Sequence, residues 1–425
     1  MEEIDIALDA IRKKLVGKTL TYKEIYALMD EIAKDKLGDV LTTYFAASGY
    51  AKGFRKEEIF YLTKAMVETG EKLSFTGIVA DKHSIGGVPG TRTTLIIVPI
   101  IAACGFTIPK SSSRAITTAS GTADDMEILA PVEFTKERIY EIVKNTNGCI
   151  VWGGSFHIAP ADDVLIKVEE PLLFESYDKI LISIMAKKIA FGATHVVIDL
   201  PYGKTVKVHR LSDAEILKEK FEYLASKFGI KIRVLISKIE EPAGWGIGPV
   251  LETRDALLVL EQKPQRPLDL EKKAVMLAGN LLELCLIDSP PTLRDSVKKT
   301  YGTPTQWATH VLQSGMAKQK MQEIVREQGG SPHVQSDDLK PGKHTYSHRA
   351  RSNKKIKHIH SKNAIIITKI LGAPKQKGAG IFFHKKTGDH INVNETLYTL
   401  YSETVYNLQE AKQSLDNFPI IQQEE

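Results

Sequence analysis

The spacing of apolar residues predicts helices over residues 1–70. Ile4, Leu8 and Ile11 recur at the helical interval, and Thr21-Tyr-Lys-Glu24 has the sequence of a capping box that starts a second helix. A further apolar series ends at Gly70. We therefore expect this first part of the chain to be helical throughout.

From residue 75 onward, short apolar runs alternate with amphipathic stretches, which is typical of an α/β sheet flanked by helices. The expected strands cover residues 75–80, 105–109, 149–152, 195–200 and 231–236, and the expected helices cover residues 93–104, 135–147, 183–190 and 212–228. Beyond Lys354 the runs become short and alternating, at residues 364–368, 380–383 and 396–401. They predict a small α+β unit at the C-terminal end.

Composition narrows the class of protein. The chain has 425 residues, of which 43% are hydrophobic, so it can build several domains with full cores. Its 3 cysteines are widely spaced and predict buried free thiols rather than a disulfide framework or a zinc site. No apolar run approaches the length of a membrane span, and the acidic first residues lack the cationic region of a secretory signal. We expect a cytoplasmic protein with no membrane partner.

The net charge of +5 is concentrated in residues 340–362, which hold eight Lys or Arg, four His and no carboxylate. A basic tract of this length can bind nucleic acid, but Tyr346 is its one aromatic residue. We therefore expect a solvated loop or hairpin between domains, and we do not expect a nucleic-acid partner. His358 and His360 would share one face of a strand, but two ligands do not make a metal site.

Residues 81–92 combine three glycines and a proline with Lys82, His83, Ser84 and Arg92. Glycines let backbone N–H groups approach an anion, and the start of the helix that follows adds a partial positive charge. The segment therefore predicts a loop that holds a phosphate group beside an imidazole. The alternative is an ordinary glycine-rich turn with a solvated lysine.

A second segment, residues 109–126, holds seven Ser or Thr together with Lys110 and Arg114. Hydroxyls and cations form charge-assisted hydrogen bonds to phosphate oxygens. Helix capping explains part of the cluster, and we expect Thr122 to be an N-cap. Capping does not explain so many hydroxyls beside Arg114, so the segment predicts a second part of an anion site.

These segments resemble the motifs of the thymidine phosphorylase family, and most closely those of its AMP phosphorylase branch. Five matching segments follow one another in the family's order, at residues 81–90, 112–118, 121–124, 183–188 and 372–381. The resemblance implies a multi-domain α/β fold. Its parts would be a helical domain from residues 1–72 and 163–194, a central α/β phosphate-binding domain with a mixed sheet from residues 73–162 and 195–335, and a C-terminal α+β domain from residues 340–425.

The resemblance also implies an activity and the residues that serve it. The enzyme would be a pentosyltransferase that cleaves the N-glycosidic bond of a nucleoside or nucleoside 5′-monophosphate with inorganic phosphate, giving a free base and a pentose phosphate. The residues implied to hold phosphate are Lys82, Ser84, Thr93, Ser112 and Thr122, although Thr93 could equally be a plain helix cap. The residues implied to contact the nucleotide are Gly87, Ser113, Arg114, Ala115, Ile116, Thr117, Thr118, Ser183, Lys187 and Lys207.

Two residues are candidates for protonating the leaving base. His83 has that position by resemblance to thymidine phosphorylase, and an ordinary histidine pKa of about 6.5 suits the task. Glu175 stands where the AMP branch has an aspartate proton donor, and its side chain is one methylene longer. Glu169 stands where thymidine phosphorylases have an arginine that holds the pyrimidine oxygens. An acceptor there suits the amino group of adenine, so AMP is the first substrate that we expect.

The implied reaction needs no metal or organic cofactor, only inorganic phosphate as co-substrate. AMP phosphorylases carry an additional N-terminal domain, and this chain begins where that domain would end, so we expect a homodimer built on the helical domain.

Three alternatives remain open. They are a thymidine phosphorylase that forms thymine and 2-deoxyribose 1-phosphate, an anthranilate-type phosphoribosyltransferase that needs magnesium, and a non-catalytic nucleotide- or RNA-binding protein that uses residues 340–362. Asp124 and Asp125 could suggest a magnesium site, but adjacent residues on a helix point apart.

Overall fold

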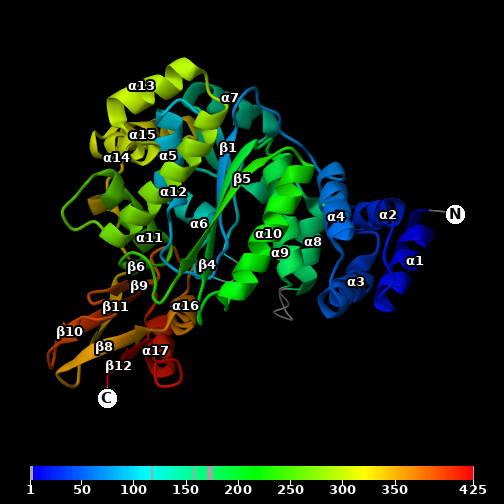
Figure 1. The fold of residues 1–425 in the computed structure, drawn as a ribbon. Helices are drawn as coiled ribbons and strands as arrows, with labels where there is room; N and C mark the ends of the chain where they lie inside the picture. The colour runs from blue at the N-terminus through cyan, green and yellow to red at the C-terminus, as the bar shows by residue number, and fades with distance from the viewer. Residues whose placement is uncertain (1–2, 116–117, 157, 170–175, 425) are drawn as a thin grey trace.

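The protein folds into the three domains that the sequence predicts: a helical domain, a central α/β domain and a C-terminal α+β domain (Figure 1). The structure is a computed structural model, and it describes residues 3–115, 118–156, 158–169 and 176–424.

The helical domain joins two segments that are far apart in the sequence. The first holds α1 (Glu3–Leu15), α2 (Tyr22–Ala33), α3 (Gly38–Lys52) and α4 (Lys56–Glu68), and the second holds α8 (Pro160–Glu169) and α9 (Tyr177–Ala190). The capping box of α2 is confirmed, because Thr21 and Glu24 bond reciprocally. Helix α3 agrees with the expectation that residues 1–70 are helical, but its limits were not predicted, because its glycines and adjacent threonines weaken both its helix propensity and its apolar periodicity.

The central domain is built on parallel strands. They are β1 (Ala80–Ser84), β2 (Ile108–Ser112), β3 (Gly148–Trp152), β4 (His195–Tyr202) and β5 (Lys231–Lys238). β1 pairs with β4 and β4 with β5, β2 pairs with β3, and a bridge from Val79 to Thr107 links β1 to β2. The spatial order is therefore β3-β2-β1-β4-β5, and every described pairing among these strands is parallel. In such a sheet, the carboxyl ends of neighbouring strands form the ligand-binding edge.

Helices cover both faces of this sheet (Figure 1). Val197 of β4 belongs to the core that contains α5 and α12, whereas Val196 and Ile198 belong to the core that contains α10 and the helical domain. The helices of the domain are α5 (Thr94–Ala103), α6 (Thr122–Met126), α7 (Lys136–Thr146), α10 (Leu211–Lys227), α11 (Pro249–Leu260), α12 (Leu268–Ile287), α13 (Pro291–Tyr301), α14 (Pro304–Gln313) and α15 (Met316–Glu327), with short 3-10 helices at Gly153–Phe156 and Ser336–Asp338.

Two strand predictions were displaced. The strand expected at residues 75–80 is β1, which begins at Ala80 and contains Lys82, His83 and Ser84, residues that we expected on a loop. The strand expected at residues 105–109 is β2, which runs from Ile108 to Ser112. Both errors have the same cause: the second halves of these strands are polar although they are buried or partly buried, so they lack the apolar run that marks a buried strand.

The C-terminal domain is antiparallel. It holds β7 (His344–Arg349), β8 (Lys354–Ile359), β9 (Gly380–Phe383), β10 (His390–Ile391), β11 (Thr396–Ser402), β12 (Ile421–Gln423), α16 (Ser361–Ile370) and α17 (Val405–Ser414). The strand orders are β6-β9-β11-β7 and β10-β8-β12. Because β6 (Gly246–Ile247) precedes α11, one of these sheets is anchored directly on the central domain.

Two predictions for this domain were wrong. The basic residues 340–362 were expected to form a loop or hairpin between domains, but they contain β7 and β8, which lie in two different sheets. The apolar run at residues 364–368 was grouped with alternating runs, but it lies in helix α16. A short apolar run has no periodicity long enough to separate helix from strand.

The remaining general predictions concern thiols and membranes. Cys104, Cys149 and Cys285 are free cysteines, as predicted. Within the described residues, no helix combines the length and the apolar character that crossing a membrane requires.

A buried ion pair in the helical domain gives a first testable prediction. Lys14 Nζ contacts both carboxylate oxygens of Glu58, at 3.0 and 3.1 Å, and these side chains are 4% and 1% exposed. Lys14→Met leaves a buried carboxylate without its counterion, so we expect the free energy of unfolding to fall by about 3–5 kcal/mol.

The matched control is Lys13→Met. Lys13 pairs with Glu24 at the surface, and its side chain is 47% exposed, so we expect a loss of at most about 1 kcal/mol. Urea unfolding followed by circular dichroism measures both variants. Equal losses would show that the Lys14–Glu58 pair does not stabilise the bundle.

Candidate active site

Lys82 lies near the carboxyl end of β1 and is 2% exposed. Its Nζ donates a hydrogen bond to Thr93 Oγ1 at 2.7 Å. Thr93 stands at the N-cap of α5, but its hydroxyl forms no capping hydrogen bond within the described chain. The hydroxyl therefore contacts Lys82 instead of capping the helix, and the ammonium group lies close to the N-terminus of α5, where anions bind favourably.

Ser84, the last residue of β1, is oriented by a carboxylate. Its Oγ donates to Asp199 Oδ2 at 2.7 Å, and Lys273 Nζ of α12 lies 3.0 Å from the same oxygen. Asp199 is 1% exposed and stands opposite Ser84 in the β1–β4 pairing. The Ser84 hydroxyl thus lies beside a second lysine.

Two further buried lysines surround Asp81. Lys188 Nζ lies 2.5 Å from Asp81 Oδ2, and Lys110 Nζ lies 3.7 Å from Oδ1. We call these residues, together with Lys82, Lys273 and Asp199, the lysine cluster. Its described part holds four lysines and two carboxylates. Uncompensated charge is costly away from water, so the cluster favours a bound anion.

The pKa values reflect this excess of positive charge. Burial, opposed by Asp199, lowers the pKa of Lys82 to about 7, and burial with the neighbouring Lys188 lowers the pKa of Lys110 to about 7. Burial and the same lysines hold the pKa of the half-buried His83 well below its ordinary value. A phosphate dianion in the cluster opposes all three shifts, because it stabilises the protonated forms.

Ser112 and Thr122 border the hydroxyl-rich segment. Ser112 ends β2, and its Oγ is buried without a hydrogen-bond partner among the described residues, which suits a site for a ligand oxygen. Thr122 is the first residue of α6, so the expectation that it is the N-cap was wrong. The N-cap is Gly121. This position needs glycine, because a Cβ there would lie 2.4 Å from the backbone of Arg114.

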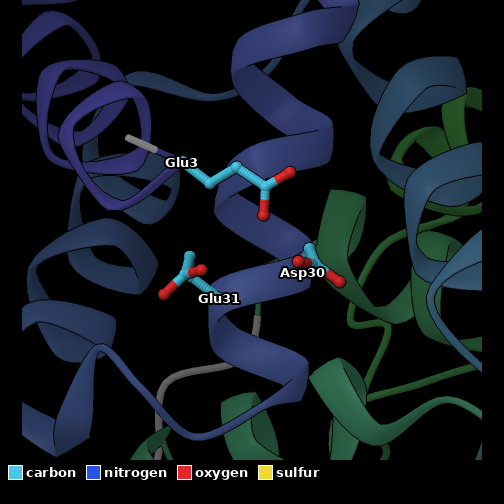
Figure 2. Close-up of side chains that lie close together, drawn as sticks. All are labelled: Glu3, Asp30 and Glu31. Atoms are coloured by element: carbon cyan, nitrogen blue, oxygen red, sulfur yellow. The ribbon is translucent and has the colours of Figure 1, made fainter. Parts of the chain in front are cut away.

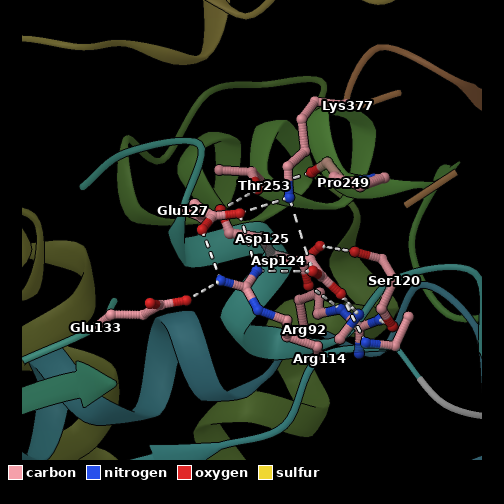
Figure 3. A network of polar contacts seen from close by, with 12 residues as sticks. Arg92, Arg114, Ser120, Asp124, Asp125, Glu127, Glu133, Pro249, Thr253 and Lys377 are labelled. Atoms are coloured by element: carbon pink, nitrogen blue, oxygen red, sulfur yellow. Dashed lines mark hydrogen bonds and ion pairs between the residues drawn. The ribbon is translucent and has the colours of Figure 1, made fainter. Parts of the chain in front are cut away.

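Arg114 lies among carboxylates (Figure 3). Its guanidinium is 3.3 Å from Asp124, 2.8 Å from Glu127 and 2.8 Å from Glu133, and it lies over the ring of Trp152 at 5.1 Å. These partners hold the side chain in place, and its contact with a nucleotide stays a prediction.

Other members of this segment bond within it. Ala115 N–H donates to Asp124 Oδ2 at 2.7 Å, the carbonyl of Ser113 accepts from the backbone of α6 at 3.2 Å, and the Thr118 hydroxyl donates to a carbonyl of its own turn at 2.6 Å. Three predicted site residues lie outside the described residues, namely Ile116, Thr117 and Glu175.

Lys207 lies against the turn that contains Gly86 and Gly87. Gly87 has a φ of 99°, which favours glycine, and a Cβ there would lie 2.9 Å from Lys207 N and 3.3 Å from its Cγ. A Cβ on Gly86 would lie 3.8 Å from Lys207 Cε. The side chain therefore follows the turn of the first motif.

Ser183 and Lys187 share one face of α9, as their spacing predicts. Ser183 Oγ and Lys187 Nζ both contact Asp162 Oδ2, at 2.7 and 2.8 Å. Asp162 is fully buried, and its Oδ1 has no hydrogen-bond partner among the described residues. Glu169 is also paired, with Lys179.

Sequence analysis missed Asp162, Asp199 and Lys273. Asp199 could have been found, because it lies near the carboxyl end of a predicted strand, where parallel sheets bind ligands. Asp162 and Lys273 carry no comparable signal, since only the packing of α8 and α12 brings them to the site.

One group of carboxylates in the described chain is close enough to hold a metal ion. It comprises Glu3, Asp30 and Glu31, whose ligand atoms lie within 4.8 Å of one another. Figure 2 shows them on α1 and α2, within the helical domain. Asp30 pairs with Lys34, and Glu31 lies 3.7 Å from Lys36, so lysines balance part of this charge and we assign no metal to the group.

Comparisons with known proteins identify the family. Three family models match in order: the helical bundle domain of a glycosyl transferase family at residues 8–70, the a/b domain of that family at residues 76–222, and the pyrimidine nucleoside phosphorylase C-terminal domain at residues 356–421. The chain is 42% identical to the AMP phosphorylase of Thermofilum pendens, over 98% of this chain and 78% of that protein. The chain belongs to the thymidine phosphorylase family.

A relative from Legionella pneumophila, named "Putative thymidine phosphorylase", is also 42% identical, over 94% of this chain and 74% of that protein. The family resemblance of the motifs is thus confirmed, and the protein is a pentosyltransferase with nucleoside phosphorylase activity. The anthranilate phosphoribosyltransferase of Thermus thermophilus shares the fold, with a TM-score of 0.61 and 18% identity over 75% of this chain and 99% of that chain.

The lowered lysine pKa values predict that this family member takes up protons when it binds phosphate. At about pH 8, Lys82 and Lys110 are mostly neutral in the free protein, because their pKa is about 7, and a bound dianion raises that pKa. The number of protons taken up per bound phosphate should therefore be largest at about pH 8 and should decrease towards about pH 6, where the lysines are already charged.

Calorimetry of phosphate binding in buffers of different ionisation enthalpy measures this uptake. Lys110→Met is expected to reduce it, whereas Lys231→Met, which removes a surface lysine paired with Asp288, leaves it unchanged. Proton release at the higher pH would contradict the assignment.

Proposed function

We propose that this enzyme phosphorolyses nucleoside 5′-monophosphates, with AMP as the first substrate. Inorganic phosphate binds in the lysine cluster, and the 5′-phosphate of the substrate binds at the Gly86–Gly87 turn. Products are the free base and a pentose phosphate.

One observation carries the proposal: the Lys207 side chain follows the Gly86–Gly87 turn. This turn comes shortly after Lys82 and Ser84 in the same motif. A phosphate monoester can come close to the backbone N–H groups of a glycine turn, and a lysine along the turn adds positive charge. The lysine cluster supplies charge for inorganic phosphate, so the turn offers a second and separate anion site. An unphosphorylated nucleoside would leave that second site empty.

The base would lie near Ser183 and Lys187, which Asp162 holds together. Glu169 favours adenine over thymine as the base of the substrate, because a carboxylate accepts a hydrogen bond from an amino group and repels the carbonyl oxygens of thymine. Its ion pair with Lys179 balances the charge while leaving the residue an acceptor.

The chemical step follows from this arrangement. A phosphate oxygen attacks C1′, the bond from C1′ to the base nitrogen breaks, and that nitrogen takes a proton. Lys82 and the buried Ser112 hydroxyl align the phosphate and exclude water, which would hydrolyse the sugar. His83 can give the proton once phosphate has raised its pKa, and Glu175 is the second candidate donor.

Two alternatives are less well supported. Thymidine phosphorolysis remains the second candidate, because the relative from Legionella carries that name. A magnesium-dependent transfer is disfavoured by the acidic pair of α6: Asp125 contacts Arg92, whereas Asp124 accepts from the backbone N–H groups of Ala115 and Gly121. The two carboxylates face different partners, as the helix geometry predicted. We further propose a cytoplasmic homodimer that needs no resident cofactor.

A substrate panel with one variant tests the proposal. On AMP, CMP, UMP, thymidine and uridine, we expect phosphate-dependent base release to be greatest for AMP. Lys207→Met should lower kcat/KM for AMP by about 10–100-fold, the value of a charged hydrogen bond, and change that for adenosine by less than about twofold.

Lys204→Met is the matched control, because Lys204 is exposed on the same segment. Turnover confined to unphosphorylated thymidine would reject the proposal, and equal losses on AMP and adenosine would reject the role of Lys207.

A further inference from the structure

One carboxylate of α6 binds both ends of the loop that lies between Ser112 and Thr122, the two hydroxyl residues of this segment that are implied to hold phosphate. Asp124 Oδ2 accepts from Ala115 N–H at 2.7 Å and from Gly121 N–H at 2.9 Å, so it holds these two residues next to each other. Asp124 is 2% exposed, and Thr122 directly follows Gly121. The position of Thr122 relative to Ser112 therefore depends on where α6 places Asp124.

Helix α6 has five residues, and packing holds one side of it, because Ala123 and Met126 are fully buried in the core of the central domain. Polar contacts add to this packing: Asp125 pairs with Arg92 inside the protein, and Glu127, directly after the last residue of α6, pairs with cations at the C-terminal end of the helix. Glu127 accepts from Arg114 at 2.8 and 3.0 Å and from Lys377 Nζ at 2.7 Å, and these cations lower the pKa of its carboxyl to about 2. Lys377 Nζ also lies 3.7 Å from Asp124.

Lys377 supplies one of the two cations that face three carboxylates in this network (Figure 3). In the described part of the network, the carboxylates of Asp124, Glu127 and Glu133 face the cations of Arg114 and Lys377. Loss of the ammonium group leaves one cation for three carboxylates, and their repulsion would then weaken the hold on Asp124 and Glu127.

Lys377 comes from a part of the chain that is distant in sequence, between α16 and β9. Its carbonyl accepts from Val250 N–H at 3.2 Å, at the start of α11. The next residue, Gly378, donates to Glu403 Oε1 at 2.7 Å and accepts from Gly342 N–H at 2.8 Å. The C-terminal domain therefore holds the base of this side chain firmly, while its tip reaches the central domain.

We propose that Lys377 is a positioning residue for the phosphate pocket: through Glu127 and Asp124 it fixes α6 and thereby the Thr122 hydroxyl. The C-terminal domain thus contributes indirectly to phosphate binding, through the position of α6. This proposal rests on the phosphorylase activity of the family and not on the choice of AMP as substrate.

Kinetics of Lys377→Met test it, with whichever nucleoside or nucleotide the wild-type protein turns over best. We expect KM for phosphate to rise by about tenfold or more, the value of one charge-assisted hydrogen bond, with kcat and the KM of the second substrate within about twofold. Lys377→Arg should restore most of the phosphate affinity, because a guanidinium keeps the charge and both carboxylate contacts.

The control is Lys385→Met, which removes a 2.6 Å ion pair to Glu395 in the same domain and far along the chain from α6. Phosphate binding by calorimetry, without nucleoside, separates this proposal from the substrate assignment. Unchanged phosphate affinity in Lys377→Met overturns the proposal, and so does a loss of kcat and thermal stability with no change in the KM for phosphate. If Lys377→Met does not fold, Glu127→Gln serves as the second variant, with the same expected rise and the same criterion.

Discussion

The unbalanced positive charge at the carboxyl ends of β1 and β2 is the constraint on which the site depends. Four lysines and two carboxylates meet there, and Lys82, Lys110 and Lys188 are each at most 4% exposed. Charges so far from water are tolerated only if counterions or ligands compensate them. The free protein lowers the cost by lowering lysine pKa values, and a bound phosphate dianion removes the need to do so.

The fold builds this constraint with ordinary means. Parallel pairing of β1, β2 and β4 brings residues far apart in the sequence to one edge of the sheet, and helices on both faces exclude water from it. The N-terminus of α5 adds its dipole beside Lys82. Carboxylates then orient the polar groups: Asp199 holds Ser84, and Asp162 holds Ser183 with Lys187.

Local motifs made the family, the domain types and two members of the lysine cluster, Lys82 and Lys110, predictable, because glycines, hydroxyls and cations at set spacings carry their chemistry in the sequence. Strand limits were less predictable. β1 and β2 end in polar, partly buried residues, and only the tertiary environment shows that Lys82 and Lys110 are inside. Lys377 could not be assigned, because its role comes from a contact with a segment more than a hundred residues away. Asp162 could not be assigned either, because its partner Lys187 lies on another helix. The basic residues 340–362 were misjudged because charge pattern alone does not reveal edge and central strands.

The most direct test of the central claim is to locate the anion. Crystals soaked in tungstate, a heavy analogue of phosphate, give an anomalous difference map that shows oxyanion positions independently of any assay. The account predicts the strongest protein-bound peak within hydrogen-bonding distance of Lys82 Nζ and Ser112 Oγ, beside the N-terminus of α5. A lysine cluster without density, in crystals that bind tungstate elsewhere, would contradict it.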